Sequence, residues 1–128
     1  MGEIKNILLV EDEDNLRNLL RDFLVSKNYH LQCASSGEEA LSVMEKAGEG
    51  VDLVLTDVMM PRMSGSELVE QLRPLYPGIK VIFMSGFTGG STAVIQRSMI
   101  SPDVVFLQKP FRLNVLIEEI EALLAPPA

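Results

Sequence analysis

Residues 51–61 decide the fold of this chain and read VDLVLTDVMMP. Residues 51–56 form a short, mainly apolar run, which is typical of a strand that is buried on both faces of a sheet. Asp57 closes this run. A carboxylate at the end of a buried strand costs free energy unless it is paired or has a chemical function. Asp57 is therefore the first candidate functional residue.

Four further apolar runs lie on either side of this stretch, and helical patterns separate them. The predicted strands are Ile4–Val10, Leu31–Ala34, Val51–Thr56, Ile79–Met84 and Val104–Leu107. The predicted helices are Asp14–Ser26, a helix opened by Ser36, a helix opened by Ser64, Ser91–Met99 and Leu113–Leu124. Strands that alternate with crossover helices favour an α/β fold with a doubly wound parallel sheet.

Local signals support two of these helices. Ser36 with Glu39, and Ser64 with Glu67, have the spacing of a capping box at a helix start. In the first helix, apolar residues recur at helical spacing, and all are expected to face the sheet. These residues are Leu16, Leu19, Leu20, Phe23 and Leu24.

Polar residues follow four of the five predicted strands. Glu11 and Asp12 follow the first strand, Asp57 the third, Ser85 the fourth and Lys109 the fifth. Ligands of open parallel sheets bind beyond the carboxyl ends of the strands. A strand order of 2-1-3-4-5 would place these four ends side by side and leave the second strand at the edge. The polar residues are then expected to form one site.

This set of residues suggests a cation-assisted phosphoryl acceptor. Three carboxylates in one place repel one another, and Mg²⁺ relieves the repulsion through oxygen ligands. Asp57 and Asp12 are the expected direct ligands, and Glu11 would bind directly or through water. A bound cation would also let the Asp57 carboxylate attack a phosphoryl group and form an acyl phosphate. Lys109 would pair with Asp57 and then with the phosphoryl oxygens, and Ser85 would donate a hydrogen bond to one of them.

Composition and length limit the other possibilities. The chain has 128 residues, which suggests one domain over residues 1–125 and a tail or linker start at residues 126–128. A net charge of −7 argues against direct binding of nucleic acid or of an anionic membrane. No apolar run has membrane-spanning length, and the N-terminus lacks a signal-peptide pattern. Cys33 is the only cysteine, so no internal disulfide can form, and the chain is expected to be cytoplasmic.

These motifs together resemble a response-regulator receiver domain of two-component phosphorelays, over essentially the whole chain. The matching stretches are Val10–Asp12, Thr56–Pro61 with Gly65, Met84–Gly86 and Lys109–Phe111. The resemblance implies a flavodoxin-like (βα)5 fold with the strand order 2-1-3-4-5. It also implies Mg²⁺ as cofactor and a phosphohistidine donor on a histidine kinase or a histidine phosphotransfer domain. Within the site it implies a backbone carbonyl of Met59 as metal ligand and a cis Lys109–Pro110 peptide.

The chain departs from the usual pattern of the family in three places. Glu11 replaces the more usual aspartate, and Phe106 replaces a switching tyrosine, so that aromatic packing is expected instead of a hydroxyl hydrogen bond. The interval from Ser85 to Lys109 is slightly long, which bears on the fourth helix. Residues 84–88 and 106–111 look most like the receivers of hybrid sensor histidine kinases.

Three alternative functions share features with this sequence. An aspartate-nucleophile phosphatase would need a second aspartate where Met59 stands, so we expect the domain itself not to be a turnover enzyme. A flavodoxin-like cofactor binder would need a phosphate loop after the first strand, but residues 11–14 are all acidic. A degenerate receiver would serve as a docking module without phosphorylation. The chain is expected to be a monomer or a weak dimer.

Two further groups of residues receive plain interpretations. Asp52, near the start of the third strand, is expected to be a surface charge. The methionines are expected to fill the core, except that Met59, Met60 and Met63 would form an apolar rim beside the site.

Overall fold

The computed structural model describes residues 4–86 and 101–125 and contains a five-stranded parallel sheet in the order β2-β1-β3-β4-β5. The strands are β1 (Asn6–Val10), β2 (His30–Ala34), β3 (Leu53–Asp57), β4 (Lys80–Ser85) and β5 (Val104–Gln108). The predicted doubly wound α/β fold and its strand order are confirmed. All four polar strand ends therefore belong to the adjacent strands β1, β3, β4 and β5.

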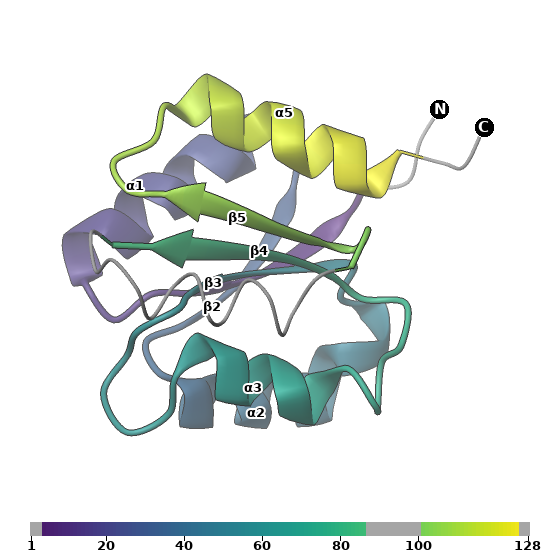
Figure 1. The fold of residues 1–128 in the computed structure, drawn as a ribbon. Coiled ribbons are helices and arrows are strands. Elements are labelled where there is room, and N and C mark those ends of the chain that lie inside the picture. The colour runs from purple at the N-terminus through teal and green to yellow at the C-terminus, as the bar shows by residue number, and fades with distance from the viewer. Residues whose placement is uncertain (1–3, 87–100, 126–128) are drawn as a thin grey trace.

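Helices cover both faces of the sheet (Figure 1). They are α1 (Asp14–Ser26), α2 (Gly37–Ala47), α3 (Gly65–Leu72) and α5 (Leu113–Leu124), with a short 3-10 turn, η1 (Gly48–Gly50), after α2. In Figure 1, α1 and α5 lie on one face and α2 and α3 on the other. The predicted helix Ser91–Met99 lies outside the described residues.

The core consists of two apolar layers, one on each face of the sheet. The layer under α2 and α3 includes the strand residues Leu8, Val10, Val54 and Phe83. The layer under α1 and α5 includes Ile7, Leu9, Leu55 and Ile82. Because neighbouring strand residues point to opposite faces, the strands are apolar along their whole length. The sheet is thereby a rigid support for residues at its carboxyl edge.

The predicted helix caps are present, but the two differ. Ser64 and Glu67 form a complete capping box at the start of α3. Ser36 accepts a hydrogen bond from the Glu39 N–H, as expected, but the Glu39 carboxylate accepts one from the Ser35 N–H instead of from Ser36. The α3 start is thus fixed reciprocally, which matters because α3 begins beside the end of β3.

Two expectations about individual side chains are wrong. Leu19 was expected to face the sheet, but its side chain is 54% exposed, because Leu20 and Leu24 already cover the sheet on that helix. Asp52 was expected to be a surface charge, but it is half-buried and its Oδ2 accepts a hydrogen bond from the Asn6 N–H at 2.8 Å. Asp52 thus links the start of β1 to the segment before β3.

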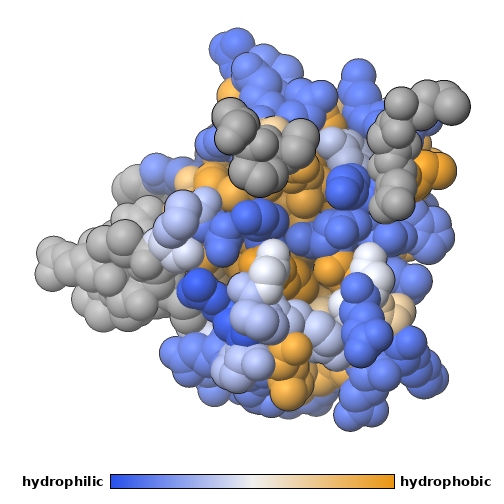
Figure 2. All heavy atoms as spheres, turned by 90° about the vertical axis from the view of Figure 1, so that its right-hand side faces the viewer, coloured by the Kyte–Doolittle hydropathy of each residue, from blue (hydrophilic) through white to orange (hydrophobic). Residues whose placement is uncertain are grey.

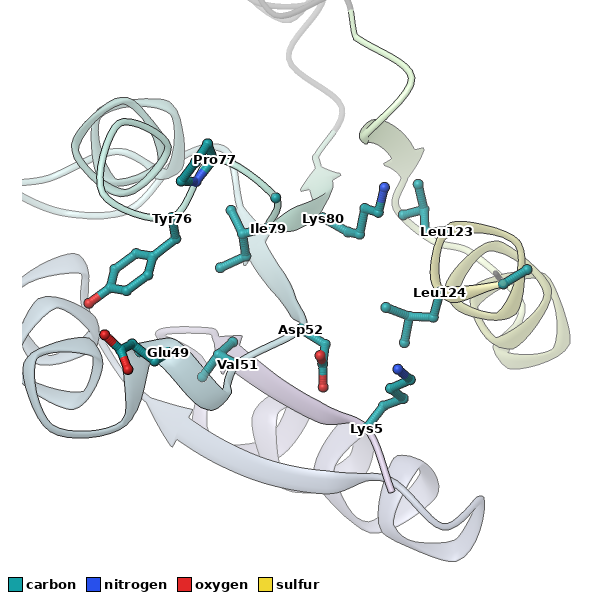
Figure 3. Close-up of a pocket in the computed structure, with 13 residues that line it drawn as sticks. Lys5, Glu49, Val51, Asp52, Tyr76, Pro77, Ile79, Lys80, Leu123 and Leu124 are labelled. Carbon is teal, nitrogen blue, oxygen red and sulfur yellow. The ribbon is translucent and has the colours of Figure 1, made fainter. Parts of the chain in front are cut away.

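The amino ends of the strands lie on the side of the molecule opposite the carboxyl edge of the sheet, and Figure 2 turns this side toward the viewer. Hydrophilic side chains dominate this view, and apolar atoms are exposed between them. A pocket of about 550 Å³ opens here, with Lys5, Asp52, Lys80 and Leu124 in its lining (Figure 3). This hollow is separated from the polar carboxyl edge by the length of the strands. Among the described helices, none is both long and apolar enough to cross a membrane.

Candidate functional site

Strand register brings the predicted site residues to one edge of the sheet. Asp57 is the last residue of β3 and Ser85 the last of β4, and Glu11 directly follows β1. All three are almost completely buried, with exposed fractions of 4%, 5% and 1%. Lys109 directly follows β5, and its backbone N–H donates to the Ser85 carbonyl at 2.7 Å. The sequence prediction that these residues are neighbours is therefore correct.

The Lys109 ammonium lies between two carboxylates. Its Nζ is 2.5 Å from Asp57 Oδ1 and 3.0 Å from Glu11 Oε1. The Lys109–Pro110 peptide is cis, as the family resemblance implied. The predicted pairing of Lys109 with Asp57 is present, and Glu11 is a second partner that the sequence argument did not assign to it.

Glu11 is held by contacts from the start of α1. Its Oε2 accepts a hydrogen bond from the Glu13 N–H at 2.9 Å. Arg17 donates from Nη1 to the Glu11 backbone carbonyl at 2.8 Å, and from Nη2 to Asp14 at 2.6 Å. Sequence reasoning did not identify Arg17. The sequence did offer a signal, which is a basic residue one turn into the helix that begins within the acidic residues 11–14.

Burial and crowding of charge shift the acidities of these groups. Burial, and then the neighbouring Glu11, raise the pKa of Asp57 to about 8, against the opposing effect of Lys109. Burial alone would raise the pKa of Glu11, but hydrogen bonds from Asp57, the Glu13 N–H and Lys109 outweigh it, so that this pKa is lowered. Burial alone would lower the pKa of Lys109, but Asp57 and Glu11 outweigh it, so that this pKa is raised.

The shifts describe a cluster with one cation and two buried carboxyl groups. Because the pKa of Asp57 is raised and that of Glu11 is lowered, the proton that the pair shares resides on Asp57 near neutral pH. The cluster then holds one negative charge against the ammonium of Lys109. A cation that binds here would replace this proton and leave both carboxylates ionised.

Asp12 adds a third carboxylate at the solvent side of the cluster. Glu11, Asp12 and Asp57 each offer an oxygen atom, and these atoms lie within 4.8 Å of one another. Two oxygens bound to one Mg²⁺ at about 2.1 Å are about 3 Å apart when adjacent and about 4 Å apart when opposite. Asp12 is exposed, whereas the other two residues are buried, so waters have access to complete the coordination shell. The three residues fit a hard divalent cation with oxygen ligands.

The remaining predicted residues surround this cluster. Ser85 is buried at the end of β4, next to the segment that carries Lys109. The Phe106 ring on β5 stacks on Phe83 with 4.9 Å between ring centroids, in agreement with the expected aromatic packing. The Met59 side chain is 58% exposed, whereas Met60 and Met63 pack against the core. The predicted methionine rim is therefore reduced to Met59.

Known proteins are similar to this chain over most of its length. Residues 7–121 match the family described as "Response regulator receiver domain". The chain is 41% identical over 118 residues to the sensor kinase CckA of Brucella abortus, and the match covers 92% of this chain and 12% of that protein. It is 35% identical over 121 residues to the response regulator receiver protein CpdR of the same organism, and this match covers 94% of this chain and 98% of that protein.

Solved structures give the same grouping. The receiver domain of the hybrid histidine kinase CckA aligns with a TM-score of 0.76 and 30% identity, covering 92% of this chain and 98% of that one. The chemotaxis protein CheY4 of Vibrio cholerae aligns with a TM-score of 0.84 and 25% identity, covering 95% and 100%. The chain thus spans nearly all of some relatives, but only 12% of the sensor kinase and about half of the regulator RprY of Bacteroides fragilis.

Proposed function

Because the chain belongs to the response-regulator receiver family, we propose that it accepts a phosphoryl group on Asp57 in a Mg²⁺-dependent reaction. The observation that supports this most directly is the contact of Asp57 with Lys109, at 2.5 Å, inside a group of three carboxylates that fits a divalent cation. Bound Mg²⁺ would neutralise the charge that otherwise keeps two anions, carboxylate and phosphoryl group, apart.

The nucleophile is the Asp57 carboxylate. One carboxylate oxygen forms the new O–P bond while the N–P bond of a phosphohistidine breaks, and the imidazole leaves with its electron pair. The ionised form of Asp57 is the reactive one, so its proton must depart before the transfer. Glu11, Asp12 and Asp57 would hold the cation, together with the Met59 backbone carbonyl. The spacing of the three carboxylate oxygens supports their part of this assignment. The Met59 carbonyl is assigned by resemblance to the family.

Lys109 and Ser85 would hold the transferred group. Once Asp57 carries a phosphoryl group, the Lys109 ammonium is close enough to bind one of its oxygens without moving far from its present position. Ser85, at the end of the adjacent strand, would donate its hydroxyl to another oxygen. A shift of Ser85 would then be transmitted to Phe106, because β4, which ends at Ser85, is paired with β5, which carries Phe106. Phe106 has no hydroxyl, so the signal would pass through its packing on Phe83.

The donor is proposed to be a phosphohistidine on a histidine kinase or a histidine phosphotransfer domain. The domain would occupy residues 1–125 and would be cytoplasmic, with residues 126–128 as tail or linker start. It would undergo a single transfer to itself and would not turn over a substrate. Similarity to the sensor kinase CckA and to the receiver protein CpdR supports two settings, a hybrid kinase receiver and a separate regulator.

Intact-mass spectrometry tests the proposal. The protein is incubated with a small phosphodonor, acetyl phosphate, with Mg²⁺ or with excess chelator. We expect the mass of one phosphoryl group to be added only with Mg²⁺. Asp57→Asn should abolish labelling, whereas Asp103→Asn, at the other end of the sheet, should label normally. Full labelling of the Asp57→Asn protein would refute the assignment of the acceptor, and an unlabelled wild type would favour a docking module that needs no phosphorylation.

A further inference from the structure

A buried hydroxyl lies directly before the proposed acceptor. Thr56 is completely buried on β3, in register with Val10 on one side and Phe83 on the other. Both neighbours belong to the apolar layer under α2 and α3. Valine has nearly the shape of threonine and would fill this place without the cost of burying a hydroxyl. The presence of threonine therefore calls for a partner of the hydroxyl.

That partner is the backbone of the acceptor itself. Thr56 Oγ1 donates a hydrogen bond to the Asp57 carbonyl oxygen at 3.0 Å. The N–H of the same peptide group is fixed as well, because the Val58 N–H donates to the Met84 carbonyl at 2.9 Å. The end of β3 is thus held by a side chain from its own strand and by the backbone of β4. Both contacts restrict the direction in which the Asp57 carboxylate projects.

The start of α3 closes over the same peptide. The Gly65 N–H donates to the Val58 carbonyl at 2.8 Å, and the capping box of Ser64 with Glu67 fixes this turn. A Cβ atom on Gly65 would be 1.8 Å from the Asp57 carbonyl oxygen and 3.3 Å from Thr56 Cγ2. Only glycine allows this approach, since a Cβ atom at 1.8 Å would push the Asp57 backbone away by more than about 1 Å to reach a normal contact distance.

We propose that Thr56 and Gly65 are positioning residues for the Asp57 carboxylate. This inference rests on the proposed function, because it concerns the geometry of that phosphoryl transfer. Thr56 ties down the Asp57 carbonyl through its hydroxyl, and its methyl group lies beside the bare Cα of Gly65. The carboxylate is then held where it meets Lys109 and the other two acids. A displacement of about 1 Å at a reacting group costs as much as a hundredfold in rate.

The test compares matched pairs of variants. Thr56→Val removes the hydroxyl at constant shape, and Thr56→Ser restores it. Gly65→Ala adds the clashing Cβ, whereas Gly78→Ala adds a Cβ with no atom within 4 Å. Phosphorylation by acetyl phosphate is followed over a range of Mg²⁺ concentrations, and the melting temperature is recorded for each variant. If Gly65→Ala fails to fold, the Thr56 pair carries the test alone.

We expect Thr56→Val to lower the maximal rate by about tenfold, and Gly65→Ala by about a hundredfold, at Mg²⁺ and donor saturation. Thr56→Ser and Gly78→Ala should stay within about twofold of wild type. A purely structural role would change the melting temperature of Thr56→Val and leave its maximal rate intact, which would overturn the proposal.

A calorimetric titration with Mg²⁺ separates this inference from the proposed function. If wild type binds Mg²⁺ but is not phosphorylated, the acceptor assignment fails, and a weakened Mg²⁺ affinity of Thr56→Val still supports the positioning role. If wild type is not phosphorylated and Thr56→Val binds Mg²⁺ as tightly as wild type, the positioning role is refuted too. It is also refuted if wild type binds no Mg²⁺ at all.

Discussion

Two lysine–carboxylate pairs with the same N–O distance lie at opposite ends of the sheet. Lys109 and Asp57 are 2.5 Å apart at the carboxyl end, and Lys80 and Asp103 are 2.5 Å apart at the amino end. Asp103 is 29% exposed, whereas Asp57 is 6% exposed by its side chain. A third charged residue, Glu11, joins only the first pair, and it is buried too.

This difference shows that the distance of an ion pair does not reveal its role. Lys80 and Asp103 balance each other in contact with water, and such pairs contribute about 0–1 kcal/mol to stability. At the other end, one lysine faces two buried carboxyl groups and an exposed third one nearby. Ionising both buried carboxyl groups is costly, so Asp57 keeps its proton in the resting protein. A bound divalent cation would remove that cost, because its charge would offset those of the carboxylates.

The strongest test of the contrast removes each lysine in turn. Lys109→Met should lower the phosphorylation rate by about a hundredfold or more, because the transferred group loses its fixed cation. Lys80→Met should keep the wild-type rate, since this lysine lies at the other end of β4. Rates are taken from intact-mass time courses with acetyl phosphate and Mg²⁺. Equal rates in both variants would show that the two pairs do not differ in function.

A second test concerns the additional acid of the carboxyl-end cluster. Glu11→Gln should weaken Mg²⁺ binding by about tenfold or more, because it removes one negative charge and one oxygen donor from the site. Asp103→Asn, which neutralises an acid of the other pair, serves as control and should bind Mg²⁺ normally. The measurement is a calorimetric titration with Mg²⁺. Unchanged affinity in Glu11→Gln would remove Glu11 from the metal site.

The contrast also explains how far the sequence could predict the structure. Apolar runs and helical spacing predicted the strands and both ends of α1 and α5, since those patterns are local and strong, whereas the family resemblance implied the sheet order. The position of Asp57, Ser85 and Lys109 followed from topology alone, because parallel strands gather their carboxyl ends at one edge. The sequence therefore predicted which residues meet.

Contacts that depend on exact packing could not be predicted in the same way. Helical spacing alone suggested that Leu19 is inside, but the buried stripe of α1 is centred on Leu20 and Leu24, and Leu19 lies outside it. The Arg17 contact with the Glu11 carbonyl depends on the path of the chain between β1 and α1. The Thr56 hydroxyl could not be assigned to the Asp57 carbonyl, because a strand pattern does not distinguish threonine from valine.

The raised pKa of Asp57 predicts that the stability of the protein depends on pH. With a folded-state pKa of about 8 and an ordinary value of 3.8, the folded protein binds more protons than the unfolded chain between these pH values. Stability without metal therefore falls as pH rises through this window. An asparagine side chain resembles the protonated acid, so Asp57→Asn should be more stable than wild type at pH 8, by about 1–2 kcal/mol.

Urea unfolding in chelator at pH 5 and pH 8 measures this effect. The advantage of Asp57→Asn should shrink toward pH 5, where wild type retains its proton. The lowered pKa of Glu11 acts below its ordinary value of 4.5, because the stability that it contributes is lost as pH falls through the lowered value. The two windows therefore overlap only between pH 3.8 and pH 4.5. An advantage of equal size at both pH values would contradict the assignment of the proton to Asp57.

The smallest effect is expected for the pair at the amino end. A double-mutant cycle with Lys80→Met and Asp103→Asn should give a coupling free energy of about 0.2–1 kcal/mol in urea unfolding, and less at high salt. The side chains are 31% and 29% exposed, so water already solvates both charges and little is gained by pairing them. A coupling above about 2 kcal/mol would be typical of a buried ion pair. The Lys80–Asp103 pair would then resemble the Lys109–Asp57 pair in strength. In that case, only the additional carboxylates of Glu11 and Asp12 would distinguish the proposed phosphorylation site from the pair at the amino end.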